Sequence, residues 1–590
     1  MRWRLEWDFS LRGNLEAVKK PAPLLPAFLL FLYFVLTLSY FTSPGYIVDG
    51  LADEAAGARW ADELRNGLPF SLFRFNFHLY NGCLTRYLMM PFFYVFGTSW
   101  TIVRLWPIVF GGLTLLVTYR FANAAFKPKA GLLALLFLVI HPAYLMGVKS
   151  GNYQVSYMTF FSISSLYFLH RWWLTQKTIP LFLATFLLGL GLGTRFFFIW
   201  YGAAFGGVFL LALWDIRTQL LPGVWNKLLK PLFIAGLGFL ASTFLMWRTE
   251  LRIDTPTLPL ALQHLAASGH SPSISWDVLH RAIGGFHLFL LGHRPYENFF
   301  QASPPGNSLY PAAFWAAFIF CALLPAFRKN LPSRKTVLGL LSLFVVMQIM
   351  SVVSHVSRIQ GTPRDSQYMF VFFPFPQIVL ALAFSQLFAL LRERRFLRGL
   401  TIVFLVSFCY GEARLLADYF HRMKETGAGR RFTDAVHDVG EWLRLHPTGR
   451  RPVWVMSSDL ADNLYCIDPR IKTTVIGSVT EHPLFLCREE DFFPLWEKRL
   501  SEQSDRELLI VNDNCGYANY QKDFDLIKSW ALQRRKKFGP VAQFRDKDGT
   551  VVFEAYLLEL GEGEPSRRTS PPGTAGTAPF QSPVDNKKTL

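Results

Sequence analysis

Long apolar runs, separated by short polar stretches, dominate the hydropathy pattern of this chain. Eleven of the runs approach the length of about 20 residues that a helix needs to cross a membrane. They lie at 24–42, 100–119, 131–148, 153–170, 179–194, 196–214, 231–247, 308–326, 336–355, 367–391 and 399–415. A shorter run at 87–97 is typical of a helix lying along the membrane surface. The pattern therefore predicts a polytopic α-helical membrane protein with about eleven spans, the first of them not a cleaved signal sequence.

Basic residues are distributed unevenly between the two sides of these predicted spans. The N-terminal segment and the loops on its side carry 21 Lys and Arg, whereas the short loops on the other side carry four. Because Lys and Arg concentrate in cytoplasmic loops, residues 1–23 are predicted to lie in the cytoplasm. The domain 24–415 then has long outward loops at 43–99 and 248–307, and an odd span count places the region after it outside.

The region 416–560 has the composition of a soluble domain. Residues 434–445 have helical periodicity, while 452–457, 507–513 and 550–558 are short apolar runs of the kind that form strands. This alternation predicts a small extracytoplasmic α/β domain. The segment 561–590 is rich in Pro, Gly, Ser and Thr, and is predicted to be disordered.

Composition supports a membrane protein and argues against a nucleic-acid partner. The chain is 51% hydrophobic and only 17% charged, against about 25% charged in soluble domains. Its net charge of +18 comes largely from the loop residues that set topology. Cys466, Cys487 and Cys515 fall in the predicted outward domain, where one disulfide could form.

The first outward loop begins with an acidic pair. Residues 53–67 read as a helix that stops at Gly67, and Asp53 and Glu54 stand at its start. In the simplest interpretation Asp53 is an N-cap and Glu54 a first-turn acid, both favoured by the helix dipole. A second interpretation is compatible with it: carboxylates this close to the first span can meet the phosphate region of a lipid.

This loop resembles that of a known family. The segment DEAAGARWADELRNG resembles the Asp-Glu loop of GT-C-fold glycosyltransferases that use polyprenol-phosphate sugars, including protein O-mannosyltransferases and aminoarabinose transferases. The similarity continues through 77–112 and returns at 363–376, the segment PRDSQYMFVFFPFP. At 78–82 the chain reads HLYNG, where many members have a His-Pro-Pro or Lys-Pro motif, so the sugar and the acceptor stay open.

The resemblance implies a hexosyl- or pentosyltransferase of the cell envelope, in a bacterial inner (plasma) membrane. The donor would be a polyprenyl-phosphate sugar, and the acceptor a hydroxyl of a lipid, glycan or protein. Asp53 is the candidate base, with Glu54 as reserve or orienting group. The candidate phosphate-binding residues are outward-facing cations at span ends: Arg358, Arg364, Lys149 and Arg195.

Three questions stay open at this stage. The chemistry needs no certain cofactor but allows a divalent cation, and the histidines of loop 248–307 do not form a convincing zinc set. A multispan transporter or flippase of a lipid-linked substrate is the main alternative, although transporters usually place ionisable groups at mid-membrane. A receptor-like or scaffold protein, with its C-terminal domain as the active part, is a third possibility.

Overall fold

The computed structural model describes most of the chain. The described residues are 24–43, 45, 52–68, 84–151, 155–195, 198–217, 224–250, 276–300, 302, 309–327, 334–356, 366–428, 433–445, 453–475, 496–497, 500, 507–514 and 518–560. The predicted disordered tail at 561–590 lies outside them, as does the N-terminal segment 1–23.

Helices form the larger part of the described structure. In chain order they are α2 (Leu24–Leu38), α3 (Ala52–Arg65), α4 (Leu84–Phe96), α5 (Trp100–Phe126), α6 (Pro128–Val139), α7 (Pro142–Ser150), α8 (Val155–Thr175), α9 (Thr178–Leu192), α10 (Phe198–Arg217), α11 (Val224–Glu250), α13 (Trp276–Leu290), α14 (His293–Phe300), α15 (Leu309–Phe327), α16 (Arg334–Val356), the 3₁₀ helix η2 (Ser366–Phe372), α17 (Phe375–Leu390), α18 (Arg395–Thr426), α19 (Ala435–Leu445), α20 (Ser458–Ile467) and α22 (Ala518–Gln533).

A helix lies in each of the eleven apolar runs predicted to span. Among the described residues, five helices are long and apolar enough to cross a membrane, or six if one bent pair counts as a single span. The chain is therefore a multi-pass membrane protein, and the figure of eleven spans stays a prediction.

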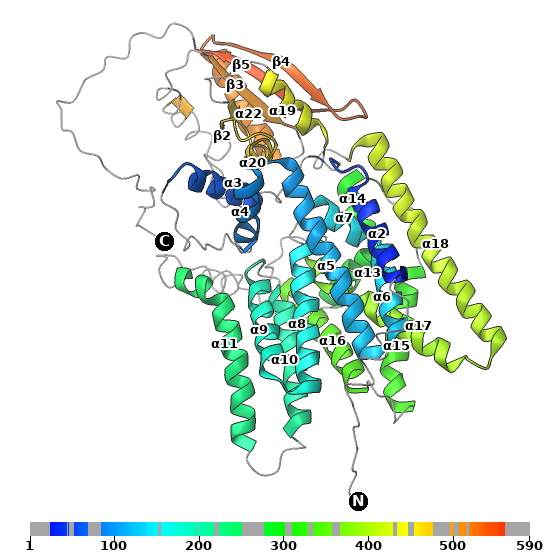
Figure 1. Cartoon of the computed structure of the whole chain (residues 1–590). Helices are drawn as coiled ribbons and strands as arrows, with labels where there is room; N and C mark the ends of the chain where they lie inside the picture. Colours follow the sequence, from blue (N-terminus) through cyan, green and yellow to red (C-terminus); the bar gives the residue numbers. More distant parts are fainter. Residues whose placement is uncertain are drawn as a thin grey trace, which may run out of the picture.

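The run 131–148 is not the single straight helix that its apolarity predicted. It is broken between α6 and α7, whose axes differ by 62°. His141 has extended backbone angles, and Pro142, which follows it, has no N–H with which to continue the hydrogen-bond ladder. The bend brings α7 beside α2 and α14, toward the end of the bundle that faces the sheet domain (Figure 1).

The C-terminal domain is built on a mixed five-stranded sheet with the order β2-β1-β3-β5-β4. The strands are β1 (Val453–Val455), β2 (Thr473–Val475), β3 (Glu507–Asp513), β4 (Lys537–Arg545) and β5 (Val551–Glu559). The inner strands β1 and β3 are parallel, while β5 pairs antiparallel with both β3 and β4. One apolar core joins α19 and α20 to the sheet, and a second joins it to α22, so the predicted α/β domain is confirmed as a sheet covered by helices.

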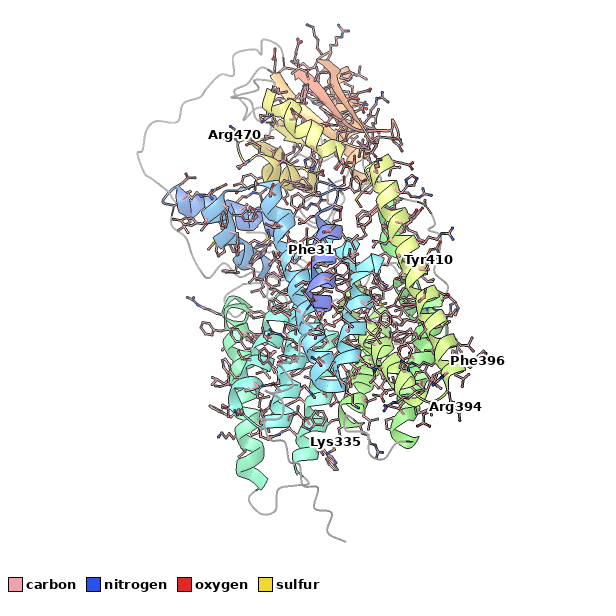
Figure 2. All side chains as sticks on the ribbon, turned by 45° about the vertical axis from the view of Figure 1, so that its right-hand side comes forward. Phe31, Lys335, Arg394, Phe396, Tyr410 and Arg470 are labelled. Atoms are coloured by element: carbon pink, nitrogen blue, oxygen red, sulfur yellow. The ribbon has the colours of Figure 1, made fainter. Side chains whose placement is uncertain are left out.

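The sheet domain sits at one end of the helical bundle (Figure 1). The hairpin formed by α3 and α4 lies between the two, next to α20. Figure 2 shows Lys335 and Arg394 at the end of the bundle away from the sheet domain, and the orientation in the membrane stays a prediction. Phe31, Phe396 and Tyr410 point outward from the flanks of the bundle, where lipid chains would surround it.

Candidate functional site

The acidic pair of the first loop is buried at the start of α3. The helix begins at Ala52, so Asp53 lies inside the first turn and is not the N-cap. Asp53 is 5% exposed and Glu54 1% exposed. Charged carboxyl groups are rarely buried without partners, and the start of a helix favours negative charge. A buried pair at this position is therefore a candidate site.

Arg86 forms an ion pair with Asp53, and the sequence did not single it out. Its Nε donates to Asp53 Oδ1 at 2.9 Å from the first turn of α4. The same guanidinium lies 5.9 Å from the centre of the Trp60 ring, so it is held between the two helices of the hairpin. Arg86 thus supplies a counter-charge to a buried carboxyl group, which few proteins leave unpaired.

Glu54 has a different environment from Asp53. Burial raises the pKa of Glu54 well above its usual range, and the neighbouring charge of Asp53 raises it further, against the opposing effects of Arg195 and Arg86. Its Oε2 has no hydrogen-bond partner among the described residues. Burial therefore favours the neutral form of the Glu54 carboxyl group.

This difference predicts a pH dependence of stability. Since folding raises the pKa of Glu54, the stability linked to it is complete below the ordinary value of 4.5 and is lost as the pH rises through the folded-state pKa. Glu54→Gln is neutral throughout, so its thermal midpoint should rise steadily relative to wild type as the pH increases from about 5. The matched variant Glu63→Gln, on the same helix, should show no such trend. A wild-type–Glu54→Gln difference that is constant with pH would contradict the assignment.

Arg195, a candidate phosphate-binding residue in the sequence, lies near Glu54 of the acidic pair. It follows α9, is 4% exposed, and lies within electrostatic reach of Glu54. The backbone ties this turn to the hairpin, because Leu84 N donates to Gly193 O at 3.0 Å. Arg195 is thus the candidate phosphate-binding residue that the described structure places beside the acids.

Tyr157 of α8 is a further neighbour that the sequence did not indicate. It is fully buried and within electrostatic reach of Glu54. Its hydroxyl has no hydrogen-bond partner among the described residues. An unsatisfied hydroxyl and an unsatisfied carboxyl oxygen in one buried region are groups that a polar substrate can bind.

Lys149 is buried but has a different set of contacts. Its ammonium donates to the carbonyls of Thr37, Ser39 and Tyr40 at the end of α2, at 3.2 Å for Thr37 and 2.7 Å for Tyr40. An ammonium has three donors, and these carbonyls use all of them. Lys149 therefore stabilises the C-terminal end of α2, and we do not include it among the residues proposed to bind the phosphate.

A substitution separates these two roles of Lys149. Lys149→Met keeps much of the apolar stem and leaves the three carbonyls without their charged donor. We expect it to lower the free energy of unfolding by about 1 to 3 kcal/mol without changing the KM for the lipid-linked donor. Chemical unfolding in detergent and donor titrations measure the two quantities. A raised donor KM with unchanged stability would restore Lys149 to the phosphate site.

Arg104 fixes the geometry beneath the hairpin. Its Nη1 donates to the carbonyls of Lys149 and Ser150, at 3.0 and 2.6 Å, and its Nη2 to that of Gly45 at 3.1 Å. In the sequence, Arg104 lies within the segment 77–112 that resembles the family, at the start of the second predicted span. In the structure it joins α5, the end of α7 and the first outward loop.

Other sequence predictions fall outside the described residues. Arg358 and Arg364 lie there, so their assignment to the phosphate stays a prediction.

Within the described part of the chain, no group of three or more His, Cys, Asp or Glu side chains could hold a metal ion. His287 Nε2 accepts a hydrogen bond from Trp315 Nε1 at 2.7 Å. Cys466 is a free, buried thiol, and Cys487 and Cys515 are outside the described residues.

Part of the chain matches a known family model, and the whole chain resembles a solved structure. Residues 82–247 match the family model described as dolichyl-phosphate-mannose-protein mannosyltransferase, a range that contains Arg86 and Arg195 and begins after the acidic pair. The archaeal oligosaccharyltransferase AglB from Archaeoglobus fulgidus, solved with an inhibitory peptide and a dolichol-phosphate, has a similar structure. It is 13% identical, with a TM-score of 0.52 over 90% of this chain and 74% of AglB. The chain has the GT-C fold.

The resemblance predicted from the first outward loop is thereby confirmed at the level of fold. ArnT from Cupriavidus metallidurans, solved bound to undecaprenyl phosphate, is also similar. It is 13% identical with a TM-score of 0.47, over 90% of this chain and 97% of ArnT. No curated protein sequence matches the chain.

Proposed function

We propose that the chain is a membrane glycosyltransferase that moves a hexosyl or pentosyl group from a polyprenyl-phosphate donor to a hydroxyl of a lipid, glycan or protein acceptor. The observation that carries the proposal is the buried pair Asp53 and Glu54, with Arg86 and Arg195 beside it at the head of the bundle. The family match supports it, and so does the dolichol-phosphate in the AglB structure.

Asp53, Arg86 and Arg195 fit a single displacement at the anomeric carbon. Asp53, held by Arg86, takes the proton of the acceptor hydroxyl as its oxygen attacks. The bond from the sugar to the phosphate oxygen breaks, and the electron pair leaves with the polyprenyl phosphate. Arg195 stabilises the charge that develops on this phosphate. Attack opposite to the leaving group inverts the anomeric configuration.

The proposed location follows from charge and from the place of the site. Helix α3, which carries the acidic pair, lies at the end of the bundle nearest the sheet domain (Figure 1), whereas Lys335 and Arg394 lie at the other end (Figure 2). Since basic ends face the cytoplasm, transfer takes place on the outer face of a bacterial inner (plasma) membrane. The N-terminus is then cytoplasmic, and the C-terminal domain extracytoplasmic. A polyprenyl donor reaches this site from within the lipid.

Sugar transfer by the purified protein tests the proposal. The full chain in lipid nanodiscs is supplied with radiolabelled polyprenyl-phosphate sugars and a membrane extract as the source of acceptors. Labelled product that depends on the protein supports a transferase. Absence of transfer from all common donors would contradict it. Movement of the lipid-linked sugar across vesicles without transfer would instead support a flippase.

A further inference from the structure

Helix α20 connects the sheet domain to the helix that carries the acidic pair. The hydroxyl of Ser457, at its N-terminus, accepts from Leu460 N and donates to Asp513 Oδ2, both at 3.0 Å. Asp513 ends β3, so the start of α20 is fastened to the sheet. The rest of α20 packs against α3, as Figure 1 also shows.

The contact between α20 and α3 is both polar and closely packed. Arg59 Nη2 donates to Asp462 Oδ1 at 2.5 Å, and the Arg59 guanidinium lies 5.0 Å from the centre of the Tyr465 ring. The Tyr465 hydroxyl donates to Asp62 Oδ2 at 2.5 Å. Between these contacts, a face of small residues on α3 lies in one apolar cluster with the buried Cys466. These small residues are Ala55, Ala58 and Ala61.

Asp462 also belongs to the electrostatic surroundings of the acidic pair. It is 8% exposed. Burial raises its pKa above the usual range, the Arg59 charge and hydrogen bond lower it, Asp53 raises it and Arg86 lowers it. The sheet domain thus brings a third carboxyl group into reach of Asp53, and binds an arginine that stands on the same helix as Asp53.

The charged and polar groups around the acidic pair and Asp462 therefore come from four parts of the chain. They are Glu54 and Arg59 on α3, Arg86 on α4, Arg195 after α9, and Asp462 with its neighbours Tyr465 and Cys466 on α20. With Asp462 in place, Arg59 has its own counter-charge. Arg86 forms an ion pair with Asp53.

We propose that Asp462 and Tyr465 are positioning residues, through which the C-terminal domain holds α3 and its acidic pair in the geometry for transfer. The inference rests on the proposed function. Positioning within about half an ångström matters in such a site, and α3 has α4 on one side and α20 on another to supply it. If the contact served only to join two domains, its loss would lower stability and leave catalysis by the folded protein unchanged.

Three variants of the full chain in nanodiscs test the proposal. Asp462→Asn removes a charge, Tyr465→Phe removes one hydrogen bond without changing charge, and Asp468→Asn is the matched control. Asp468 follows α20 and pairs with Arg470 on the outside of the sheet domain (Figure 2). Hydrogen exchange is followed in peptides from α3 and β5, and transfer kinetics are measured across a range of pH.

The expected results separate positioning from simple docking. Asp462→Asn and Tyr465→Phe should speed exchange in α3 but not in β5, and lower kcat by about 10- to 100-fold with donor KM unchanged. Asp462→Asn alone should also move the acidic limb of the pH profile to lower pH, because a negative charge has left the surroundings of the base. Asp468→Asn should change none of these.

Two results would overturn the inference. The first is exchange in α3 that stays at the wild-type rate in both α20 variants. The second is faster exchange with unchanged kcat and an unchanged pH profile, as simple docking predicts. If wild-type protein transfers no sugar, the proposed function fails by itself, and the exchange in α3 then decides whether the domain holds this helix.

Discussion

Asp53→Asn is expected to lower the rate of sugar transfer by about 100- to 10,000-fold, the range that general-base catalysis contributes. An amide has almost the shape of the carboxylate, and its oxygen can still accept the hydrogen bond from Arg86 Nε. It cannot take up the proton of an attacking hydroxyl at neutral pH. The loss should therefore appear in kcat, with the donor KM close to that of wild type.

Two controls show whether the loss of rate is specific to Asp53 and independent of stability. Glu63→Gln makes the same chemical change on the same helix, away from the start of α3, and should transfer sugar at the wild-type rate. The thermal midpoint of Asp53→Asn shows whether Arg86, now without its counter-charge, has destabilised the hairpin. Transfer at the wild-type rate by folded Asp53→Asn would remove Asp53 from the role of base.

The helical part of the fold could be predicted from hydropathy because the membrane imposes both length and composition on a spanning helix. Hydropathy averages over a window, however, so it did not detect the bend at His141 and Pro142. The strand β3 was predicted with its observed bounds, since both of its faces are buried and its sequence is a continuous apolar run. The edge strand β4 was not predicted. It is largely exposed and contains Pro540, which is tolerated at an edge but weakens a strand pattern.

The acidic pair was visible in the sequence because its two members are adjacent and follow the first span. Its partners were not. Arg86, Arg195 and Asp462 are far from Asp53 along the chain, and only the fold brings them together. Lys149 shows the converse difficulty: an outward-facing cation at a span end suits a phosphate site, but here the carbonyls at the end of α2 use its donors. Position in the sequence identified the charged candidates, while tertiary contacts decided how far each is buried and which partner it has.

Arg195→Gln is expected to lower kcat by about 100- to 1,000-fold, the usual cost of removing one group that stabilises developing negative charge. The phosphate becomes more negative as its bond to the sugar breaks, so the loss should exceed any change in donor KM. Arg195→Lys keeps a positive charge but not the planar fork of donors, and should recover only part of the activity. Arg171→Gln, at an exposed position near the far end of α8, is the matched control and should leave kcat unchanged.

If Arg195→Gln keeps its wild-type kcat, phosphate stabilisation belongs to other cations, and Arg358→Gln and Arg364→Gln become the decisive variants. The ratio of the transfer rates with donors that have better and poorer leaving groups gives an independent measure. In a variant that has lost its phosphate contact, the rate should depend more steeply on the leaving group, because the protein no longer stabilises the charge of the departing phosphate.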